Sequence, residues 1–498
     1  MKYYIGADIG TGSVKILAVD LKGTVLKVIQ KHYPVLSPHP GYSEQDPEEI
    51  WQAFSEGIHE IILACVAAPI SVGLSSAMHS LILCNASGSA LAPMITWADA
   101  RSSAIAASLK ETETGKGLYR RTGTPLHAMS PLCKLIWLKE HEPGLFRKAS
   151  KYVSIKEYIW FKLFGVWEID HSIASCTGLF NILTRDWDPE ALLLAGISTE
   201  KLSVPVPTTH IRKIAAEPLS NKHPLSENTT EWVIGASDGC LANLGTGAIK
   251  TGIAAITIGT SGAVRVTGKS PVFNNDVMTF NYILDDVYFV SGGSINNGGL
   301  AIQWMIRNIM GLEDDQVSYQ SFFDLAAGIP AGSEGLIFLP YLTGERAPVW
   351  DADSSGMFFG LKTHHTKAHL CRAVIEGICF ALQEVLAGMD QSYQDISEIR
   401  VSGGFTKSAT WTQILADVTG KKVALVQNDD ASAIGAAMLA IRTIIGAVDY
   451  LYPEQTNLNY FPQQDTHLRY QAFSNIYKSL YTNLKTQMHA LHQLSVNP

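Results

Sequence analysis

The first informative stretch is YYIGADIGTGSVKILAV, residues 3–19. Residues 3–7 and 13–19 are rich in apolar and β-branched side chains, which favours strands, and DIGTGS at residues 8–13 forms a glycine-rich turn between them. Glycine lets backbone N–H groups approach a phosphate closely, while Thr11 and Ser13 offer hydroxyl donors and Lys15 offers a cation. The stretch predicts a phosphate-binding turn between two strands, although an ordinary hairpin turn gives the same pattern.

A second stretch repeats this arrangement in the other half of the chain. Residues 254–258 and 263–267 are strand-like and flank the turn GTSG at residues 259–262. Two such turns in matching positions predict two related domains that face each other across a cleft, with the phosphates of a nucleotide between them. We place the domains at residues 1–247 and 248–498.

The two turns supply the predicted phosphate contacts. These are Thr11, Gly12, Ser13 and Lys15 in the first turn, and Gly259 and Thr260 in the second. Asp8 precedes the first turn and is suited to hold Mg²⁺, most readily through water, because Mg²⁺ keeps much of its hydration shell. A P-loop is excluded because the only GKS, at residues 268–270, has Ala263 where that motif needs glycine.

Composition narrows the class of protein. The chain has 498 residues, of which 46% are hydrophobic and 17% charged, so at least two globular domains are expected. A net charge of −8 gives no broad attraction to nucleic acid or to anionic membranes, which favours a small-molecule ligand. Seven cysteines without a CxxC pair, and an N-terminus unlike a signal peptide or a membrane span, predict a cytoplasmic protein.

Strand-like and helix-like segments alternate along the chain, which predicts an α/β fold. A helix over residues 50–63 is introduced by Asp46 as its N-cap and Pro47 as its first residue. Strands are expected at residues 70–74 and 81–84, and long helices at 368–389 and 431–445. The polar tail, residues 456–498, is interpreted as a surface helix without a chemical role.

Three longer motifs carry a family resemblance. EQDPEEIW at residues 44–51, MSPLCKLIWLKEH at 129–141 and GMFFGLKTHHTKAHLCRAVIEG at 356–377 resemble the FGGY carbohydrate kinases, and the likeness extends from residue 3 to about residue 445. The resemblance implies a pair of actin-like (ribonuclease H-like) ATPase domains that flank a deep cleft and close on ATP, Mg²⁺ and a sugar.

Within the family, three loops resemble gluconokinases: SSAMHS at 75–80, ITWADARS at 95–102 and YRRTGTPLHAMSPL at 119–132. The implied reaction is ATP-dependent phosphorylation of D-gluconate at its C6 hydroxyl to give 6-phosphogluconate. Xylulokinase or ribulokinase activity remains open, as does a non-catalytic, actin-like sensor of sugar or nucleotide. A homodimer is also possible.

Asp238 is the candidate general base. It follows the apolar residues 232–234 in WVIGASDG, where a strand would end at the cleft, and its small neighbours leave room for a substrate. It also resembles the catalytic aspartate of the family. The alternative from spacing alone is an aspartate that caps the following helix.

The resemblance also implies the sugar-binding residues, which are Met78, His79, Trp97, Asp99 and Arg101 together with Asp238. Fixed donors and acceptors of this kind suit the hydroxyls of a polyol. A carboxylate on the substrate would call for an arginine, and the sequence leaves four candidates open: Arg101, Arg120, Arg121 and Arg346.

On the nucleotide side, NGGLAIQW at 297–304 and SGGFTKS at 402–408 resemble the adenosine loops of the family. The implied contacts are Gly299, Gln303, Gly403, Gly404 and Ser408. One departure concerns Gly12, which stands where many relatives have a second hydroxyl residue, so one phosphate contact of the first turn is in doubt.

Overall fold

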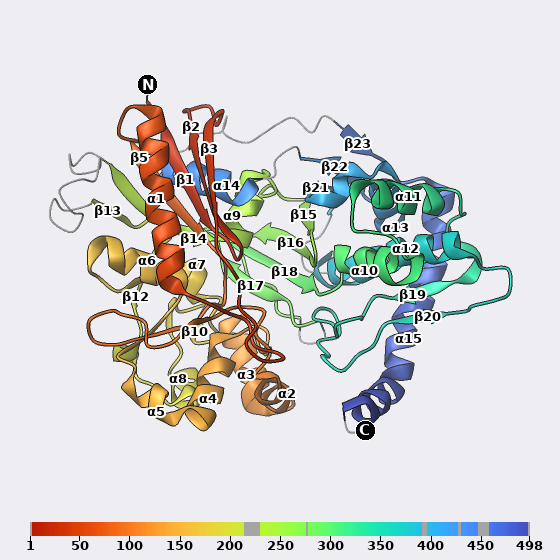
Figure 1. Cartoon of the computed structure of the whole chain (residues 1–498), viewed down its shortest axis with the longest axis horizontal. Helices are drawn as coiled ribbons and strands as arrows, with labels where there is room; N and C mark the ends of the chain where they lie inside the picture. The colour runs from red at the N-terminus through yellow and green to blue at the C-terminus, as the bar shows by residue number, and fades with distance from the viewer. Residues whose placement is uncertain are drawn as a thin grey trace.

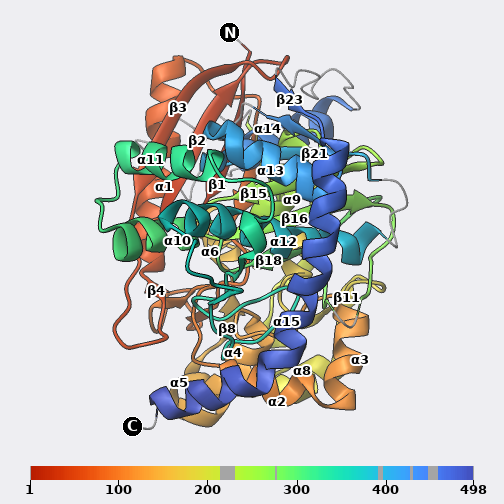
Figure 2. The ribbon, with the colours of Figure 1, turned by 90° about the vertical axis from the view of Figure 1, so that its right-hand side faces the viewer.

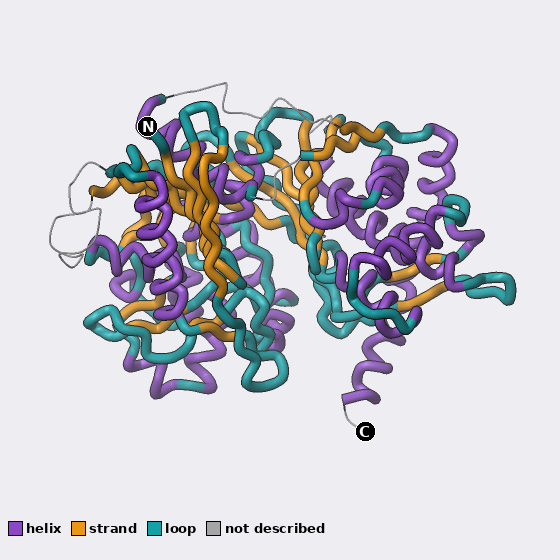
Figure 3. Tube along the Cα trace, turned by 45° about the horizontal axis from the view of Figure 1, so that its top comes forward, coloured by secondary structure: helices purple, strands orange, loops and turns teal. Residues whose placement is uncertain are grey.

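The computed structural model describes residues 2–213, 230–274, 277–390, 396–426, 430–446 and 458–496. Figure 1 shows two halves side by side, the N-terminal half in red to yellow and the C-terminal half in green to blue. Each half contains a sheet flanked by helices, and Figure 3 shows the strands gathered into these sheets with helices around them. The predicted α/β class is therefore confirmed.

The sheet of the first half has six strands in the order β13-β14-β5-β1-β2-β3. β1, β2 and β3 are antiparallel neighbours, whereas β5 and β14 run parallel to β1. Both β1 and β5 are almost wholly buried, as expected for strands covered on both faces. The strands are β1 (Tyr4–Ile9), β2 (Ser13–Val19), β3 (Val25–His32), β5 (Ser71–Ser76), β13 (Ile211–Lys213) and β14 (Glu231–Ser237).

The sheet of the second half repeats this plan. Its seven strands have the order β17-β18-β16-β15-β21-β22-β23, and six of them match the first sheet in order and direction, β17 being additional. The duplication predicted from the two glycine turns thus extends to the topology of the described strands. They are β15 (Ile253–Ile258), β16 (Gly262–Gly268), β17 (Phe280–Ile283), β18 (Phe289–Ile295), β21 (Glu398–Ser402), β22 (Lys422–Leu425) and β23 (Leu458–Tyr460).

Helix α1 (Pro47–Cys65) begins as its sequence predicts. Asp46 is the N-cap, and its side chain accepts a hydrogen bond of 2.8 Å from the backbone N–H of Glu48, while Pro47 occupies the first turn. Ile50, Phe54, Ile58 and Ile61 recur at helical spacing and are buried in the core of the first half. The predicted long helices are present as α12 (Lys367–Asp390) and α14 (Ala431–Ile445).

Two helices cross where the halves meet, α9 (Asp238–Gly245) and α14. Although α14 belongs to the second half of the sequence, it packs on β1 and β5 of the first sheet, and Figure 1 shows it beside β1. Glycines permit this approach: a Cβ on Gly6 would lie 1.9 Å from the Ala433 carbonyl oxygen, and one on Gly435 would lie 1.9 Å from that of Leu241. The first sheet is therefore covered partly by the second half of the chain.

Smaller elements extend each half. In the first half they lie beneath the sheet in Figure 1 and bear the loops of the predicted sugar site. They are β4 (Glu44–Gln45), β6 (Ile82–Cys84), β7 (Met94–Ile95), α2 (Ser103–Lys110), α3 (Glu113–Thr122), α4 (Pro131–His141), α5 (Pro143–Lys148), β8 (Lys151–Val153), α6 (Ile155–Phe164), β9 (Glu168–Asp170), α7 (His171–Ala174), β10 (Phe180–Asn181), β11 (Asp186–Trp187), α8 (Pro189–Ala195) and β12 (Val204–Val206). In the second half they are α10 (Gly299–Trp304), α11 (Gln316–Ala327), β19 (Ile337–Leu339), β20 (Met357–Phe359) and α13 (Ala409–Thr419).

The tail forms α15 (Gln464–Val496), which Figure 2 shows running along the outside of the second half. The expected helix is present, but it is more than a surface element, because Tyr470 and Tyr477 are 0% exposed. The Tyr470 hydroxyl donates to Glu376 of α12 at 2.7 Å. Two of the scattered aromatics of the tail, Tyr470 and Tyr477, are thus core residues. The first residues of the predicted tail lie outside the described part of the chain.

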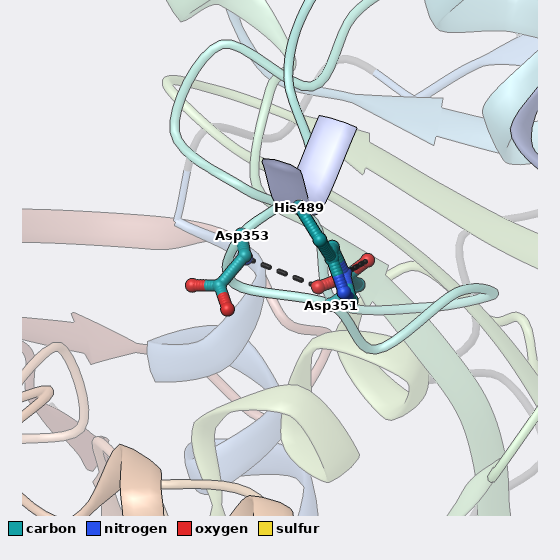
Figure 4. Close-up of side chains that lie close together, drawn as sticks. All are labelled: Asp351, Asp353 and His489. Carbon is teal, nitrogen blue, oxygen red and sulfur yellow. Dashed lines mark hydrogen bonds and ion pairs between the residues drawn. The ribbon is translucent and has the colours of Figure 1, made fainter. Parts of the chain in front are cut away.

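Further along, α15 contacts the loop that contains Asp351 and Asp353. Tyr481 donates to Asp351 at 2.8 Å, and His489 lies 2.7 Å from the same carboxylate oxygen, with Asp353 beside them (Figure 4). Asp351 closes the loop that begins at Glu345, since Glu345 and Asp351 exchange two backbone hydrogen bonds of 2.8 Å. The tail helix therefore fixes the loop that bears Arg346.

All seven cysteines are free, and six of them are buried, in agreement with the absence of a predicted disulfide framework. Among the described helices, none combines the length and the apolar composition needed for a bilayer crossing.

Candidate active site

The first glycine turn opens onto a pocket of about 290 Å³ at the junction of the two halves. The structure brings together all the contacts predicted for this turn and adds residues from the second half. The lining includes Asp8, Gly10, Thr11, Gly12, Ser13 and Lys15 from the first half and Thr257, Ser402, Gly403, Asp430 and Ser432 from the second. The predicted phosphate turn therefore faces the second half, as expected.

Neighbouring side chains fix the shape of this turn. Trp97 Nε1 donates to Thr11 Oγ1 at 2.9 Å, and Gln45 donates to the Thr11 carbonyl at 2.7 Å. Lys15 Nζ lies 2.5 Å from Asp430, so the predicted cation bridges the two halves. A Cβ on Gly12 would meet no atom within 4 Å, so the turn itself has space for the hydroxyl residue that Gly12 replaces.

A second pocket, of about 540 Å³, lies between the other glycine turn and two loops of the second half. Five predicted nucleotide contacts line it, namely Gly259, Thr260, Gly299, Gln303 and Gly404. Gly403 lines the first pocket, so the pair Gly403–Gly404 connects the two. The wall also contains Tyr319, Phe323, Phe405 and Trp411, which sequence reasoning did not single out because isolated aromatics are typical of cores.

Ser408 is a predicted nucleotide residue that lines neither of these two pockets. Its hydroxyl accepts from the Trp411 backbone N–H at 3.2 Å and caps α13, and the residue is buried. Gly403 adopts φ 106°, and a Cβ there would lie 2.3 Å from the Ile258 carbonyl oxygen, so this position requires glycine.

Asp238 is the first residue of α9, directly after β14. The N-cap is Ser237, so the helix-capping alternative does not describe Asp238. One carboxylate oxygen accepts from the Gly239 N–H at 2.7 Å. Burial raises the pKa of Asp238, and the nearby Arg265 guanidinium opposes that effect.

Asp8 shares its surroundings with Asp238. Burial and the negative charge of Asp238 raise the pKa of Asp8 to about 7, although Ser75 donates a hydrogen bond of 2.6 Å to it. Two half-buried carboxyl groups therefore lie close to the phosphate turns. Such a pair provides hard oxygen ligands, which Mg²⁺ prefers.

The SSAMHS loop, residues 75–80, also lies close to Asp238. The terminal methyl of Met78 lies beside Gly239, next to Asp238. His79 has φ 64° and is buried, and its Nδ1 lies 2.7 Å from the Cys176 carbonyl and its Nε2 3.1 Å from the Tyr282 hydroxyl. Burial and the charge of Lys134 lower the pKa of His79 to about 3, so the ring is neutral. Nδ1 then donates to Cys176, and Nε2 accepts from Tyr282.

Lys134 is a buried cation that sequence reasoning did not select, although it lies inside the motif MSPLCKLIWLKEH. It is 0% exposed and donates to the carbonyls of His79 at 2.6 Å and Thr96 at 2.7 Å. Burial lowers the pKa of Lys134 to about 7. This one side chain fixes the SSAMHS loop and the ITWADARS loop relative to each other.

Asp99 and Arg101, predicted as sugar contacts, form an ion pair with each other. Arg101 donates to both oxygens of Asp99, at 2.9 and 2.8 Å, and forms a further ion pair with Glu44. Its guanidinium carbon lies 3.7 Å from the centroid of the Tyr42 ring. Arg101 lines a separate pocket of about 370 Å³, whereas Trp97 lies at the phosphate turn. The structure therefore groups Trp97, but not Asp99 and Arg101, with the first turn.

Two arginines of the second half lie near the predicted site, Arg265 beside Asp238 and Arg346 beside Trp97. Arg265 lies on β16, and a Cβ on Gly239 would lie 2.9 Å from its Nε. Arg346 has its guanidinium carbon 5.4 Å from the centroid of the Trp97 ring. Arg346 was one of four predicted arginine candidates. Arg265 was missed, because one basic residue in a strand is typical of a solvent-facing position.

Comparison with known proteins supports the assignment of the fold. Residues 3–245 match the family described as "FGGY family of carbohydrate kinases, N-terminal domain", and residues 254–444 match its C-terminal domain. A gluconokinase of Bacillus subtilis is 39% identical over 447 residues, which cover 88% of this chain and 87% of that protein.

Two crystal structures are similar along nearly the whole chain. A gluconate kinase of Lactobacillus acidophilus superposes with a TM-score of 0.91 at 33% identity, covering 97% of this chain and 98% of the other. A ligand-bound xylulose kinase of the same species gives a TM-score of 0.92 at 32% identity, covering 99% and 100%. Both halves, the connection between them and the duplicated sheets are thus those of the two-domain, actin-like ATPase fold, and the chain belongs to the FGGY family of carbohydrate kinases.

Proposed function

We propose that the protein transfers the γ-phosphoryl group of ATP to the C6 hydroxyl of D-gluconate and forms 6-phosphogluconate. The observation that carries the proposal is the pair of pockets that join at Gly403–Gly404, with Asp8 at the inner pocket and Asp238 next to it. Gluconate as the acceptor is supported by the similarity to the gluconokinase of Bacillus subtilis and the gluconate kinase of Lactobacillus acidophilus.

The adenosine part of ATP would occupy the larger pocket, where Phe405 and Trp411 offer apolar surface and Gln303 offers an amide. The phosphates would pass Gly403 and reach the first turn, where Thr11, Ser13 and Lys15 face the smaller pocket. Backbone N–H groups of a glycine turn bind phosphate oxygens without a bulky side chain between them.

Asp238 would act as the general base. Its carboxylate accepts the proton of the C6 hydroxyl as that oxygen bonds to the γ-phosphorus, and the bond from phosphorus to the β,γ-bridging oxygen breaks to release ADP. Gly239, the methyl of Met78 and the guanidinium of Arg265 lie beside the carboxylate.

The residues present fit a bound Mg²⁺, because Asp8 and Asp238 provide two neighbouring carboxylates that are only half-buried. Asp8 would hold the ion, through water, beside the phosphate turn. When bound with ATP, Mg²⁺ neutralises charge on the phosphate oxygens.

The first half would bind the polyol. We propose Met78, His79 and Trp97 as its contacts, with the neutral His79 ring held between Cys176 and Tyr282. Asp99 and Arg101 would act by fixing their loop, since they form an ion pair with each other and Arg101 also pairs with Glu44. Reduced, buried cysteines and the use of ATP suit a cytoplasmic enzyme.

A ketopentose is the second candidate acceptor, because the chain is as similar to a ligand-bound xylulose kinase as to a gluconate kinase. A coupled assay of ADP formation with gluconate, xylulose and ribulose separates these functions. We expect turnover with gluconate and little with the ketopentoses. Turnover with a ketopentose alone would overturn the choice of gluconate, and no turnover with any polyol would favour the non-catalytic sensor.

The nucleotide pocket gives a matched pair of glycine variants. A Cβ on Gly404 would meet no atom within 4 Å, so we expect Gly404→Leu to fold normally but to fill the pocket, raising KM for ATP about tenfold or more. Gly403→Leu should instead lower the melting temperature, because its φ and the Ile258 carbonyl exclude a Cβ. Steady-state kinetics and thermal unfolding test both, and an unchanged KM for Gly404→Leu would contradict the pocket assignment.

A further inference from the structure

Arg265 is a half-buried arginine whose guanidinium has no partner among the described residues. Its Nε is enclosed and has no hydrogen-bond partner, and no carboxylate of the described part of the chain forms an ion pair with it. Burying a cation in this way is costly unless an anion meets it. Asp238 is the acidic group whose charge acts most strongly on Arg265, yet the base must also remain accessible to a substrate hydroxyl.

Arg346 is a second cation close to the first, and this residue is buried. It is 8% exposed and donates to two neutral acceptors, Asn296 at 2.7 Å and the Ile295 carbonyl at 3.1 Å. Its neighbour Glu345 is occupied by backbone N–H groups, including that of Arg346 itself at 2.8 Å. The guanidinium of Arg346 is therefore only partly compensated by the protein.

The two arginines flank the predicted sugar site. The charges of both act on the buried Tyr282, whose hydroxyl contacts His79, and each guanidinium acts on the other. Arg346 also faces Trp97 across the two halves. Two cations around one polyol site are unfavourable for a neutral sugar, but they suit an acidic one.

Resting on the proposed kinase function, we infer that Arg265 and Arg346 together bind the carboxylate of a sugar acid and determine the preference for acids over neutral polyols. The other three arginines that the sequence offered as carboxylate ligands are either paired with acidic residues or exposed. Arg101 is paired with Asp99 and Glu44, Arg121 with Asp188 and Glu190, and Arg120 is exposed.

This assignment divides the substrate between the halves. The polyol contacts Met78, His79 and Trp97 belong to the first half, whereas both arginines belong to the second. A bound acid would therefore contact both sides of the cleft, while a neutral sugar would lack the contact to the second half.

Binding of D-gluconate and D-glucitol to the purified protein, measured by calorimetry, tests the inference, because glucitol has CH₂OH in place of the carboxylate. The wild type should prefer gluconate. Arg265→Gln and Arg346→Gln should each weaken gluconate binding at least about 30-fold and leave glucitol binding unchanged. Arg265→Lys keeps the positive charge but loses the bidentate geometry of the guanidinium. This variant should fold and bind gluconate about tenfold more weakly than the wild type does. Arg185→Gln, remote and paired with Asp286, is the control.

The outcomes separate the two proposals. If the wild type neither binds nor phosphorylates gluconate, the proposed function fails. If it does both and the arginine variants keep the preference for gluconate, the carboxylate subsite alone is refuted. Equal losses for gluconate and glucitol would mean that the arginines only maintain the structure, and this would refute the subsite as well. Should the glutamine variants fail to fold, unchanged gluconate binding by Arg265→Lys would count against it.

Discussion

Asp238→Asn should lower kcat by a factor of about 10² to 10⁴ while the affinity for ATP stays the same. Asparagine is nearly isosteric and can still accept the Gly239 N–H hydrogen bond, but it cannot accept the proton of the substrate hydroxyl. Asp238 is absent from the linings of both nucleotide pockets, so nucleotide binding should persist. Steady-state kinetics with gluconate and a binding titration with ATP measure the two quantities.

A suitable control for this variant is Asp286→Asn, whose carboxylate is 64% exposed and paired with Arg185. It should leave both kcat and ATP affinity unchanged. If Asp238→Asn retained more than about a tenth of wild-type kcat, Asp238 would not be the general base.

Gly435→Val should destabilise the whole protein by about 3 kcal/mol, the upper end for overpacking of a close contact. Gly435 lies where α14 crosses α9, and a Cβ there would lie 1.9 Å from a backbone oxygen of Leu241, which no side-chain movement relieves. The two helices would have to separate, and α14 would also lose its fit on β1 and β5. Urea unfolding followed by circular dichroism gives the free energy of unfolding.

Gly144→Ala provides the matching control, because a Cβ at Gly144 meets no atom within 4 Å in the exposed helix α5. Its stability should be unchanged or slightly higher, since alanine favours a helix more than glycine does. A Gly435→Val protein as stable as the wild type would show that the close crossing of α9 and α14 does not limit stability.

Individual strands and helices were predictable from the sequence, because the pattern of neighbouring residues determines where they begin and end. The strand predicted at residues 13–19 is β2, and the helix predicted at 431–445 is α14, with the same bounds. Glycine turns between apolar runs and an N-cap followed by proline depend on neighbouring residues alone, so no tertiary information is needed.

The site was predictable only in part, because much of it depends on contacts between distant segments. Nothing near Arg265 in the sequence shows that β16 directs it towards Asp238, and nothing near Ser408 distinguishes a helix cap from a nucleotide contact. The role of Lys134 was equally hidden from local sequence, because the two carbonyls that accept its hydrogen bonds lie in two other loops. The roles of Asp99 and Arg101 depended likewise on Glu44, which precedes them by more than fifty residues.

The packing of α14 on the first sheet has a consequence for biosynthesis. While a nascent chain ends near residue 247, the faces of β1 and β5 around Gly6 and Gly73 have no α14 to cover them. That layer becomes available only after residue 445 has left the ribosome. The N-terminal sheet therefore cannot finish folding until α14, near the end of the chain, has been translated. A chain truncated before α14 would expose an apolar surface that is prone to aggregation.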